Sequence, residues 1–242
     1  LRPTTVLCAR LVDEGILFED NLDSARLEQY DFIIFASKHK SEKAEKTLSV
    51  HAPGNFRDAD FGGRSGRLCK SSALFQKHLF ETLNEKTKEF KLNEKYNVTL
   101  EATHHGPLID KPCVFIEIGS TETEWNDRRA GFVVAQTIKT AIETFEVNDY
   151  REVAIGIGGS HYCPGFNKLQ LESNVAFSHV IPSYVFPIDK YMILEAIQKT
   201  GEEVDFAVLD WKGLGNAEMR EQIIKVLDEN YIIWKKRSDV KN

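Results

Sequence analysis

The chain has 242 residues, of which 42% are hydrophobic and 28% charged, with a formal net charge of −6. This length allows one substantial core, with or without an inserted lobe, and the acidic charge argues against a general nucleic-acid binder. No apolar run approaches the roughly 18 residues of a membrane span, and the first residues lack the apolar stretch of a signal peptide. We therefore expect no membrane association. The cysteines are Cys8, Cys69, Cys113 and Cys163.

No Cys-x-x-Cys pair occurs among these four cysteines, which excludes a disulfide framework and indicates a reduced compartment, most simply the cytoplasm. No feature of the sequence indicates an obligate protein partner, and we expect a monomer.

Short apolar, β-branched runs alternate with longer amphipathic patterns along the chain. The short runs predict strands over residues 5–9, 32–36, 97–103, 113–118, 152–157, 175–181 and 205–209. Helices are predicted after Ser71 and Ser72, over about 126–145, after Asp189 and over about 217–228. This alternation predicts an α/β fold in which a mostly parallel central sheet has helices on both faces. We expect a single domain over residues 1–242.

Residues 38–70 are basic within an acidic chain. The segment holds eight basic and four acidic residues, a formal charge of +4, and shows little periodicity. It predicts a long loop or small lobe, and its charge suits either a phosphate-binding surface or a solvated loop face.

Reactive side chains follow several predicted strands. They are His104 and His105 after 97–103, Glu117 and then Glu122 at the end of 113–118, His161 after 152–157, His179 late in 175–181, and Asp210 and Lys212 after 205–209. Ligands of open α/β sheets bind beyond the carboxyl ends of the strands. The pattern therefore predicts a polar site across one end of the sheet.

Two of these positions are the most informative. Neighbouring residues on a strand face opposite sides, so His104 and His105 share a site only if the chain bends, and Gly106-Pro107 is a candidate bend. Imidazole is a common zinc ligand and a natural base near neutral pH. Glu117 interrupts an apolar run, so it is either an edge-strand residue facing water or a buried carboxylate that needs a cation.

Two glycine-containing turns are weaker signals. Gly158 and Gly159 precede His161, and their amides could approach a ligand closely, but the spacing is not a dinucleotide fingerprint and Pro164 argues against a helix start there. Lys212 could bind phosphate, pair with Asp210 or lie in a solvated turn.

Five motifs, in order, resemble those of the archaeal and plant D-aminoacyl-tRNA deacylases. They are residues 50–55 (His51 among them), 102–107 together with 115–122 and Trp125, 158–162 with Pro164, 175–182, and 209–214. Small residues differ from the family's usual pattern: Ser160 and Ser178 stand where glycine is usual, and Cys163 where alanine is usual.

The resemblance implies a fold of the phosphorylase/hydrolase kind and hydrolysis of the ester that joins a D-amino acid to the terminal adenosine of tRNA. It also implies zinc. Our hypothesis is that zinc is held by some of His104, His105, Glu117, His161 and His179, and that it activates a water. Proton transfer is assigned to Glu122 or a spare histidine, so the expected catalytic residues are His104, Glu117, Glu122 and His161.

Substrate binding is assigned to His51, Gly158, Gly159, Tyr162 and Lys212. The glycine amides would stabilise the oxyanion, and residues 38–70 would hold the acceptor end of a tRNA charged with a D-amino acid. The alternatives are a nucleoside phosphorylase-like or peptidase-like hydrolase, and a non-catalytic RNA-binding module with a closed structural zinc site.

Overall fold

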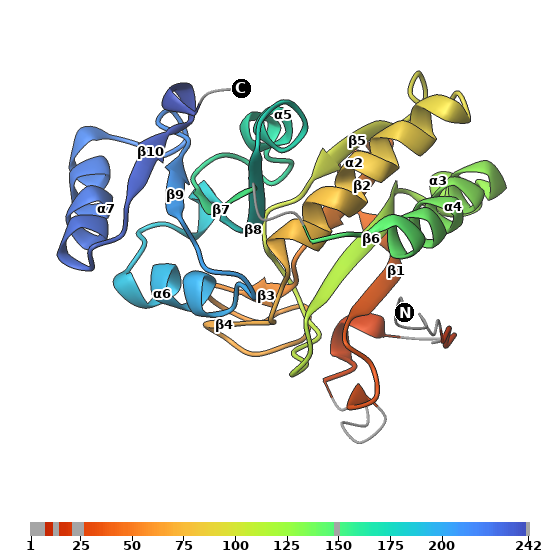
Figure 1. Cartoon of the computed structure of the whole chain (residues 1–242), viewed down its shortest axis with the longest axis horizontal. Coiled ribbons are helices and arrows are strands. Elements are labelled where there is room, and N and C mark those ends of the chain that lie inside the picture. Colours follow the sequence, from red (N-terminus) through yellow and green to blue (C-terminus); the bar gives the residue numbers. More distant parts are fainter. Residues whose placement is uncertain (1–7, 12–14, 21–26, 148–150, 241–242) are drawn as a thin grey trace.

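The computed structural model describes residues 8–11, 15–20, 27–147 and 151–240 (Figure 1). The α-helices are α2 (Ala73–Glu89), α3 (Glu122–Trp125), α4 (Arg128–Thr144), α5 (Pro164–Glu172), α6 (Lys190–Gln198) and α7 (Ala217–Glu229). The strands are β1 (Ile33–Lys40), β2 (Thr47–His51), β3 (Gly54–Asn55), β4 (Arg67–Leu68), β5 (Asn97–Leu100), β6 (Cys113–Ser120), β7 (Glu152–Ile157), β8 (Val175–Ile181), β9 (Phe206–Leu209) and β10 (Trp234–Lys236). Within the described ranges, no helix is long and apolar enough to cross a membrane.

The first sheet has the strand order β1-β6-β2-β5 and two unlike faces. β1 is parallel to β6 and β5 is parallel to β2, whereas β2 and β6 are antiparallel. Side chains alternate along a strand, so Leu48, Val50 and Ile116 share one face and join the apolar core with α2 and α4. The other face is polar over much of β2 and the later parts of β1 and β6, and this face positions the site.

The second sheet has the order β10-β9-β7-β8, is parallel throughout and is apolar on both faces. Ile155 and Leu209 pack in a cluster with α6 and α7. Phe177 and Val208, on the opposite face, belong to the cluster shared with the first sheet, α2 and α5. Helix α2 contacts strands of both sheets and lies near the centre of the molecule in Figure 1.

The predicted α/β class, with parallel-rich sheets and helices, is confirmed. The long strands are divided between two four-stranded sheets, because β5 pairs with β2 while β7 pairs with β8 and β9, and β3 and β4 form a separate two-stranded sheet. Four predicted helices are present and begin at short polar residues that accept backbone hydrogen bonds: Ser72 for α2, Asp127 for α4, Asp189 for α6 and Asn216 for α7.

Helix α5 corrects one inference from the sequence. Pro164 does not prevent a helix; it occupies the first turn of α5. Proline suits that position, because the first helical N–H groups have no partner within the helix and the fixed φ angle of proline is helical.

Residues 38–70 are more ordered than the predicted loop. They include the end of β1, all of β2, and the β3–β4 hairpin. Every residue of β2 is buried, including Thr47, Ser49 and His51. These polar residues face the site, whereas Leu48 and Val50, which alternate with them, face the core. The resulting mixture of polar and apolar residues explains why the sequence predicted a loop here. The strand predicted over 5–9 lies largely outside the described residues, and Cys8 and Ala9 are not in a strand.

Candidate metal and active site

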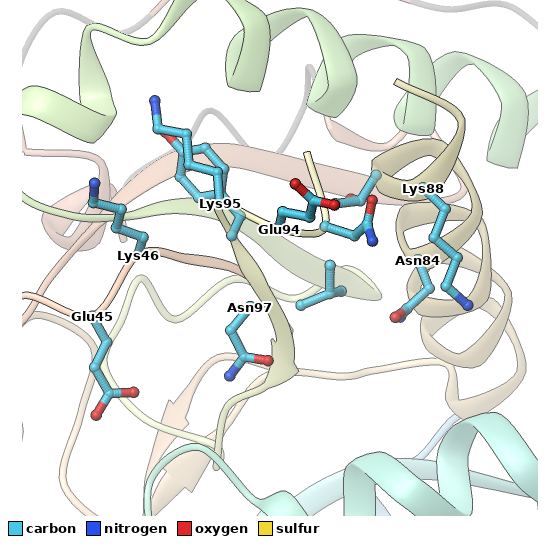
Figure 2. Close-up of a pocket in the computed structure, with 11 residues that line it drawn as sticks. Glu45, Lys46, Asn84, Lys88, Glu94, Lys95 and Asn97 are labelled. Atoms are coloured by element: carbon cyan, nitrogen blue, oxygen red, sulfur yellow. The ribbon is translucent and has the colours of Figure 1, made fainter. Parts of the chain in front are cut away.

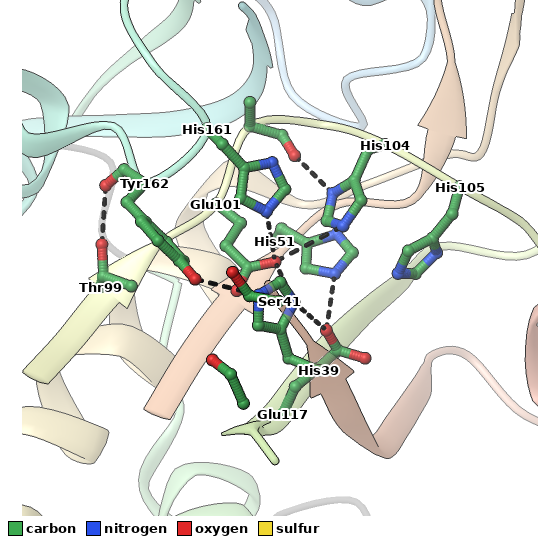
Figure 3. A network of polar contacts seen from close by, with 12 residues as sticks. His39, Ser41, His51, Thr99, Glu101, His104, His105, Glu117, His161 and Tyr162 are labelled. Carbon is green, nitrogen blue, oxygen red and sulfur yellow. Dashed lines mark hydrogen bonds and ion pairs between the residues drawn. The ribbon is translucent and has the colours of Figure 1, made fainter. Parts of the chain in front are cut away.

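Histidine and glutamate side chains project from the polar face of the first sheet (Figure 3). His39 is on β1, Glu117 on β6 and His51 on β2, and Glu101 directly follows β5. The strand register places them on one face, because Ser49 lies opposite Glu117 and His51 lies opposite Phe115. Each residue thus reaches the site through the period-2 alternation of its own strand.

Two loops bring three further histidines over this face. His104 and His105 follow β5, and His161 follows β7. The backbone of His105 has a φ of 45°, in the left-handed region, so the bend falls at His105 itself, immediately before Gly106-Pro107. Both neighbouring rings therefore approach His51, with centroid separations of 4.3 Å for His104 and 4.8 Å for His105.

One carboxylate oxygen lies at the centre of the cluster. Oε2 of Glu101 is 3.4 Å from Nδ1 of His39, 3.5 Å from Nε2 of His104 and 3.3 Å from Nε2 of His161. The four ligand atoms all lie within 4.8 Å of one another. Atoms bound at about 2.1 Å by a tetrahedral zinc ion lie about 3.4 Å apart. The spacing of these four side chains therefore matches a metal-ligand set.

Two overlapping groups extend this cluster. His51, His104 and His105 form one, and His51, Glu101 and Glu117 form the other, with the same mutual separation limit of 4.8 Å. Nε2 of His51 lies 3.5 Å from Oε2 of Glu117. The three groups share residues, so potential metal-ligand atoms lie next to one another across the polar face.

Backbone carbonyls orient the histidine rings. Nδ1 of His104 lies 2.8 Å from the Ala102 carbonyl, Nδ1 of His105 lies 2.7 Å from the Gly106 carbonyl, and Nδ1 of His51 lies 3.2 Å from the Ala52 carbonyl. A carbonyl can only accept, so these contacts place the proton on Nδ1 and leave the Nε2 lone pair free for a metal or a proton. The hydroxyl of Tyr162 lies 3.1 Å from Nε2 of His39, which directs Nδ1 of His39 toward Glu101.

Several buried polar atoms in the cluster lack a hydrogen bond. They include both carboxylate oxygens of Glu101, Oε2 of Glu117 and Nε2 of His51. A buried carboxylate is costly unless a cation or several donors compensate it. These residues therefore fit a bound metal ion, by donor chemistry as well as by spacing.

The charges also suit metal binding. Burial would raise the pKa of Glu101, but the close approach of His161 and the charges of nearby histidines lower it to about 2. Burial holds the pKa of His104 well below its usual value and that of His105 at about 4. Metal ligands must be deprotonated, and near neutral pH these three side chains are.

A separate surface pocket of about 610 Å³ lies away from the cluster (Figure 2). It is lined by residues at the start of β2 and β5 and the end of α2, whereas His51 and Glu101 lie at the other ends of those strands. Two of its three lysines have nearby acidic partners: Lys95 contacts Asp127 at 2.6 Å, and Lys46 contacts Glu124 at 3.9 Å. We therefore assign the chemistry to the histidine–glutamate cluster.

Comparison with known proteins identifies the family. A sequence model of the family described as D-aminoacyl-tRNA deacylase matches residues 26–235. The chain belongs to the D-aminoacyl-tRNA deacylase family. Proteins of that name from Thermococcus onnurineus and Methanocaldococcus jannaschii are 40% and 35% identical; the alignments cover 90% and 89% of this chain and 79% and 86% of theirs. A crystal structure of a conserved protein of unknown function, 33% identical, superposes with a TM-score of 0.84 over 94% of this chain and 79% of that one.

The deacylase structure brings together most of the residues predicted from the sequence. His51, His104, His105, Glu117, His161 and Tyr162 all lie in the cluster. They meet on a face of the first sheet, and of these six residues His161 and Tyr162 come from the loop that follows β7 of the second sheet. The site predicted across one end of a single sheet lies instead on a face of the first sheet, where β6, which carries Glu117, runs antiparallel to β2.

Two predicted residues lie outside the cluster. His179 is not in any of the ligand groups found among the described residues; its Nδ1 lies 3.2 Å from the Thr103 hydroxyl, in the core. Glu122 is exposed in the first turn of α3 and also belongs to none of these groups. We leave both out of the proposed ligand set, because neither supplies an atom near Glu101.

The structure gives no support to substrate-binding roles for Gly158 and Lys212. Gly158 and Gly159 have φ angles of 99° and 88°, which only glycine adopts readily. The Gly158 N–H donates to the Ile181 carbonyl at 2.8 Å, so it is not free to bind an oxyanion. A side chain on Gly213 would clash with Gly159, which shows how closely these two turns pack. Lys212 is exposed beside them and reaches no ligand group within the described ranges.

Two central residues of the deacylase site were missed. Glu101 follows Thr99 and Leu100 in a polar–apolar alternation, the signal that marks one polar strand face. His39 stands between two lysines and resembles part of a charged surface. Only the pairing of β1, β6, β2 and β5 reveals that these residues share a face with Glu117.

Proposed function

We propose that this chain hydrolyses the ester bond between a D-amino acid and the terminal adenosine of tRNA, as a zinc-dependent cytoplasmic monomer. Family membership supports the reaction. The convergence of three histidines on Oε2 of Glu101 supports the metal, and this observation carries the mechanistic part of the proposal.

The residues that would hold zinc are His39, Glu101, His104 and His161. The side chains of His104 and His161 are 22% and 30% exposed, whereas Glu101 is fully buried. A site that is open on one side suits catalysis, whereas structural zinc sites are closed. When bound there, zinc would supply Lewis acidity.

His51 and Glu117 are placed to move a proton. Burial would lower the pKa of His51, but the nearby carboxylate of Glu117 has the larger effect and raises it. A proton released from the attacking water can reside on Nε2 of His51 next to Oε2 of Glu117, 3.5 Å away. The ribose oxygen takes up a proton as it leaves, which completes hydrolysis to a free D-amino acid and tRNA.

Basic residues of the segment 38–70 are candidates for binding the acceptor end. Lys40, Lys43 and Arg64 are exposed, whereas Arg67 and Lys70 contact Glu195 and Asp110. Contacts with phosphates are weakened by salt, so the apparent KM for tRNA should rise with ionic strength. Selection of the D enantiomer would come from the shape of the pocket around the ester, to which we assign no single residue.

The test is hydrolysis of D-tyrosyl-tRNA and L-tyrosyl-tRNA, before and after chelation and after addition of zinc. Cleavage of the D form alone, lost on chelation and restored by zinc, is the expected result. D-selective cleavage that survives complete removal of metal would refute the zinc proposal and retain the reaction. Failure of the folded, zinc-loaded protein to cleave either form would refute the reaction and favour an RNA-binding module.

A further inference from the structure

Tyr184 presents an aromatic ring beside the cluster. It lies in the short 3-10 helix η2 (Ser183–Val185), after β8, and its side chain is 57% exposed. Its hydroxyl is 3.5 Å from Nδ1 of His161, and the two ring centroids are 6.4 Å apart. A large ring at the edge of a site, with much of its surface in solvent, is available to bind a ligand.

The accessible side of the cluster is the side next to Tyr184. His51 and Glu101 have no exposed side-chain surface, and His39 is only 7% exposed. His161 is the most exposed ring of the four-residue ligand group, at 30%. The other exposed ring of the group is His104, at 22%, so a substrate that reaches Glu101 approaches over these two rings, and Tyr184 lies beside His161.

The backbone that carries Tyr184 is held from two sides. The N–H and hydroxyl of Ser183 both donate to the Gly159 carbonyl, at 2.9 and 2.8 Å. The guanidinium of Arg57 donates to the Val185 carbonyl at 2.6 Å and also to the Pro187 carbonyl. A fixed backbone reduces the entropy lost when a ligand orders the ring. The ring itself remains outside the apolar clusters of the core.

The substrate of the proposed function has a matching ring. From the ester oxygen on the ribose, about four bonds of roughly 1.5 Å lead to the adenine, so its ring lies about 5–7 Å away. The ring centroids of His161 and Tyr184 are 6.4 Å apart, which is within this range. An ester held at His161 would therefore place the adenine ring next to Tyr184. Bases stack on aromatic side chains, and tyrosine is a common partner.

We infer that Tyr184 binds the 3′-terminal adenine of tRNA by stacking and thereby positions the ester at the cluster. This inference rests on the proposed function for its substrate. It makes Tyr184 a substrate-binding residue, in contrast to a role in which its hydroxyl orients His161. The two roles differ because stacking needs the ring, whereas orientation of His161 needs the hydroxyl.

The first test measures binding and does not depend on hydrolysis. Two short RNAs are compared, one ending in a 3′ adenosine and one with an abasic 3′ nucleotide. We expect loss of the base to weaken binding to the wild type by roughly 5- to 150-fold, and to have little effect on Tyr184→Ala. The inference would be overturned if removal of the base weakened binding equally in the wild type and in Tyr184→Ala. It would also be overturned if the adenosine-ended RNA showed no measurable binding to the wild type.

The second test uses D-tyrosyl-tRNA and separates ring from hydroxyl. Tyr184→Ala should raise KM by roughly 5- to 150-fold, with a smaller change in kcat, and Tyr184→Phe should recover most of the affinity. Tyr191→Ala is the matched control, because Tyr191 is 70% exposed on α6 and should not affect KM. A Tyr184→Phe variant as defective as Tyr184→Ala would show that the hydroxyl acts, and would contradict stacking. An inactive wild type would reject the proposed function and leave the RNA-binding test to decide on Tyr184.

Discussion

On one face of the first sheet Leu48 packs against the apolar core, whereas its neighbour Ser49 on the other face lies opposite Glu117. Both residues are fully buried. The apolar face removes hydrocarbon from water and stabilises the fold. The polar face buries carboxylate and imidazole atoms without hydrogen bonds, which costs free energy until a ligand compensates them.

The difference teaches that burial alone does not identify a residue's role in this protein. Buried residues one position apart on β2 face the apolar core on one side and the proposed metal site on the other. Substitutions on the two faces should therefore separate activity from stability.

The largest effect is expected on the polar face. Glu101→Gln keeps the size of the side chain but removes the charge on which three histidines converge. We expect deacylation to fall by more than about 100-fold and bound zinc to be lost, measured by turnover and metal analysis of the same sample. Glu122→Gln, at an exposed carboxylate outside the cluster, is the matched control and should retain both. A zinc-loaded, active Glu101→Gln protein would contradict the assignment.

The apolar face should show the opposite pattern. Leu48→Ala removes a fully buried side chain and should lower the free energy of unfolding by about 2–5 kcal/mol, measured by urea denaturation. The protein that remains folded should keep its zinc and most of its turnover. Ser49→Ala, one residue away, should change the free energy of unfolding much less, because the Ser49 hydroxyl has no hydrogen-bond partner within the described structure. Equal losses of stability in the two variants would argue against distinct faces.

His179 sharpens the comparison, because it is a buried histidine outside the polar face. Burial lowers its pKa to about 4. An unfolded histidine titrates near pH 6.5, so the unfolded chain binds the proton first as the pH falls. The contribution of His179 to stability is complete above about pH 6.5 and is lost as the pH falls toward about 4.

We expect the wild type to lose about 1.6 kcal/mol more unfolding free energy than His179→Gln between pH 6.5 and pH 5, measured by urea denaturation. Identical pH dependence in the two proteins would show that His179 does not titrate in this way. The variant should also retain zinc, since His179 lies outside the ligand groups.

The smallest effect concerns the helix that covers the apolar face. Asp127 accepts hydrogen bonds from the Arg129 and Ala130 amides at the start of α4. Asp127→Ala should lower the free energy of unfolding by about 1 kcal/mol, visible as a lower melting temperature, whereas Asp127→Asn should retain most of the cap. Full stability in the alanine variant would show that the cap contributes little.

Local patterns in the sequence were sufficient for much of the fold. The apolar runs of β6 and β8 and the capped amphipathic helices α2, α4, α6 and α7 can be located from periodicity and start signals. β2 was missed because its polar residues face a buried site, and α5 was missed because Pro164 was given too much weight as a helix breaker.

The site was predicted in part, for a related reason. Glu117 was recognisable because a carboxylate inside an apolar run is seldom explained by a purely structural role. The paired histidines were recognisable because imidazole is a common metal ligand and base. Glu101 and His39 did not stand out locally. Their importance arises from strand pairing between distant segments, β5 with β2 and β1 with β6, which no local pattern specifies.

The most direct test of the central claim is a crystal structure of the zinc-loaded protein with anomalous diffraction at the zinc edge. The account predicts a peak about 2.1 Å from Oε2 of Glu101, Nδ1 of His39 and Nε2 of His104 and His161, on the polar face of the first sheet. A fully occupied zinc ion bound elsewhere, with Glu101 making no metal contact, would contradict it.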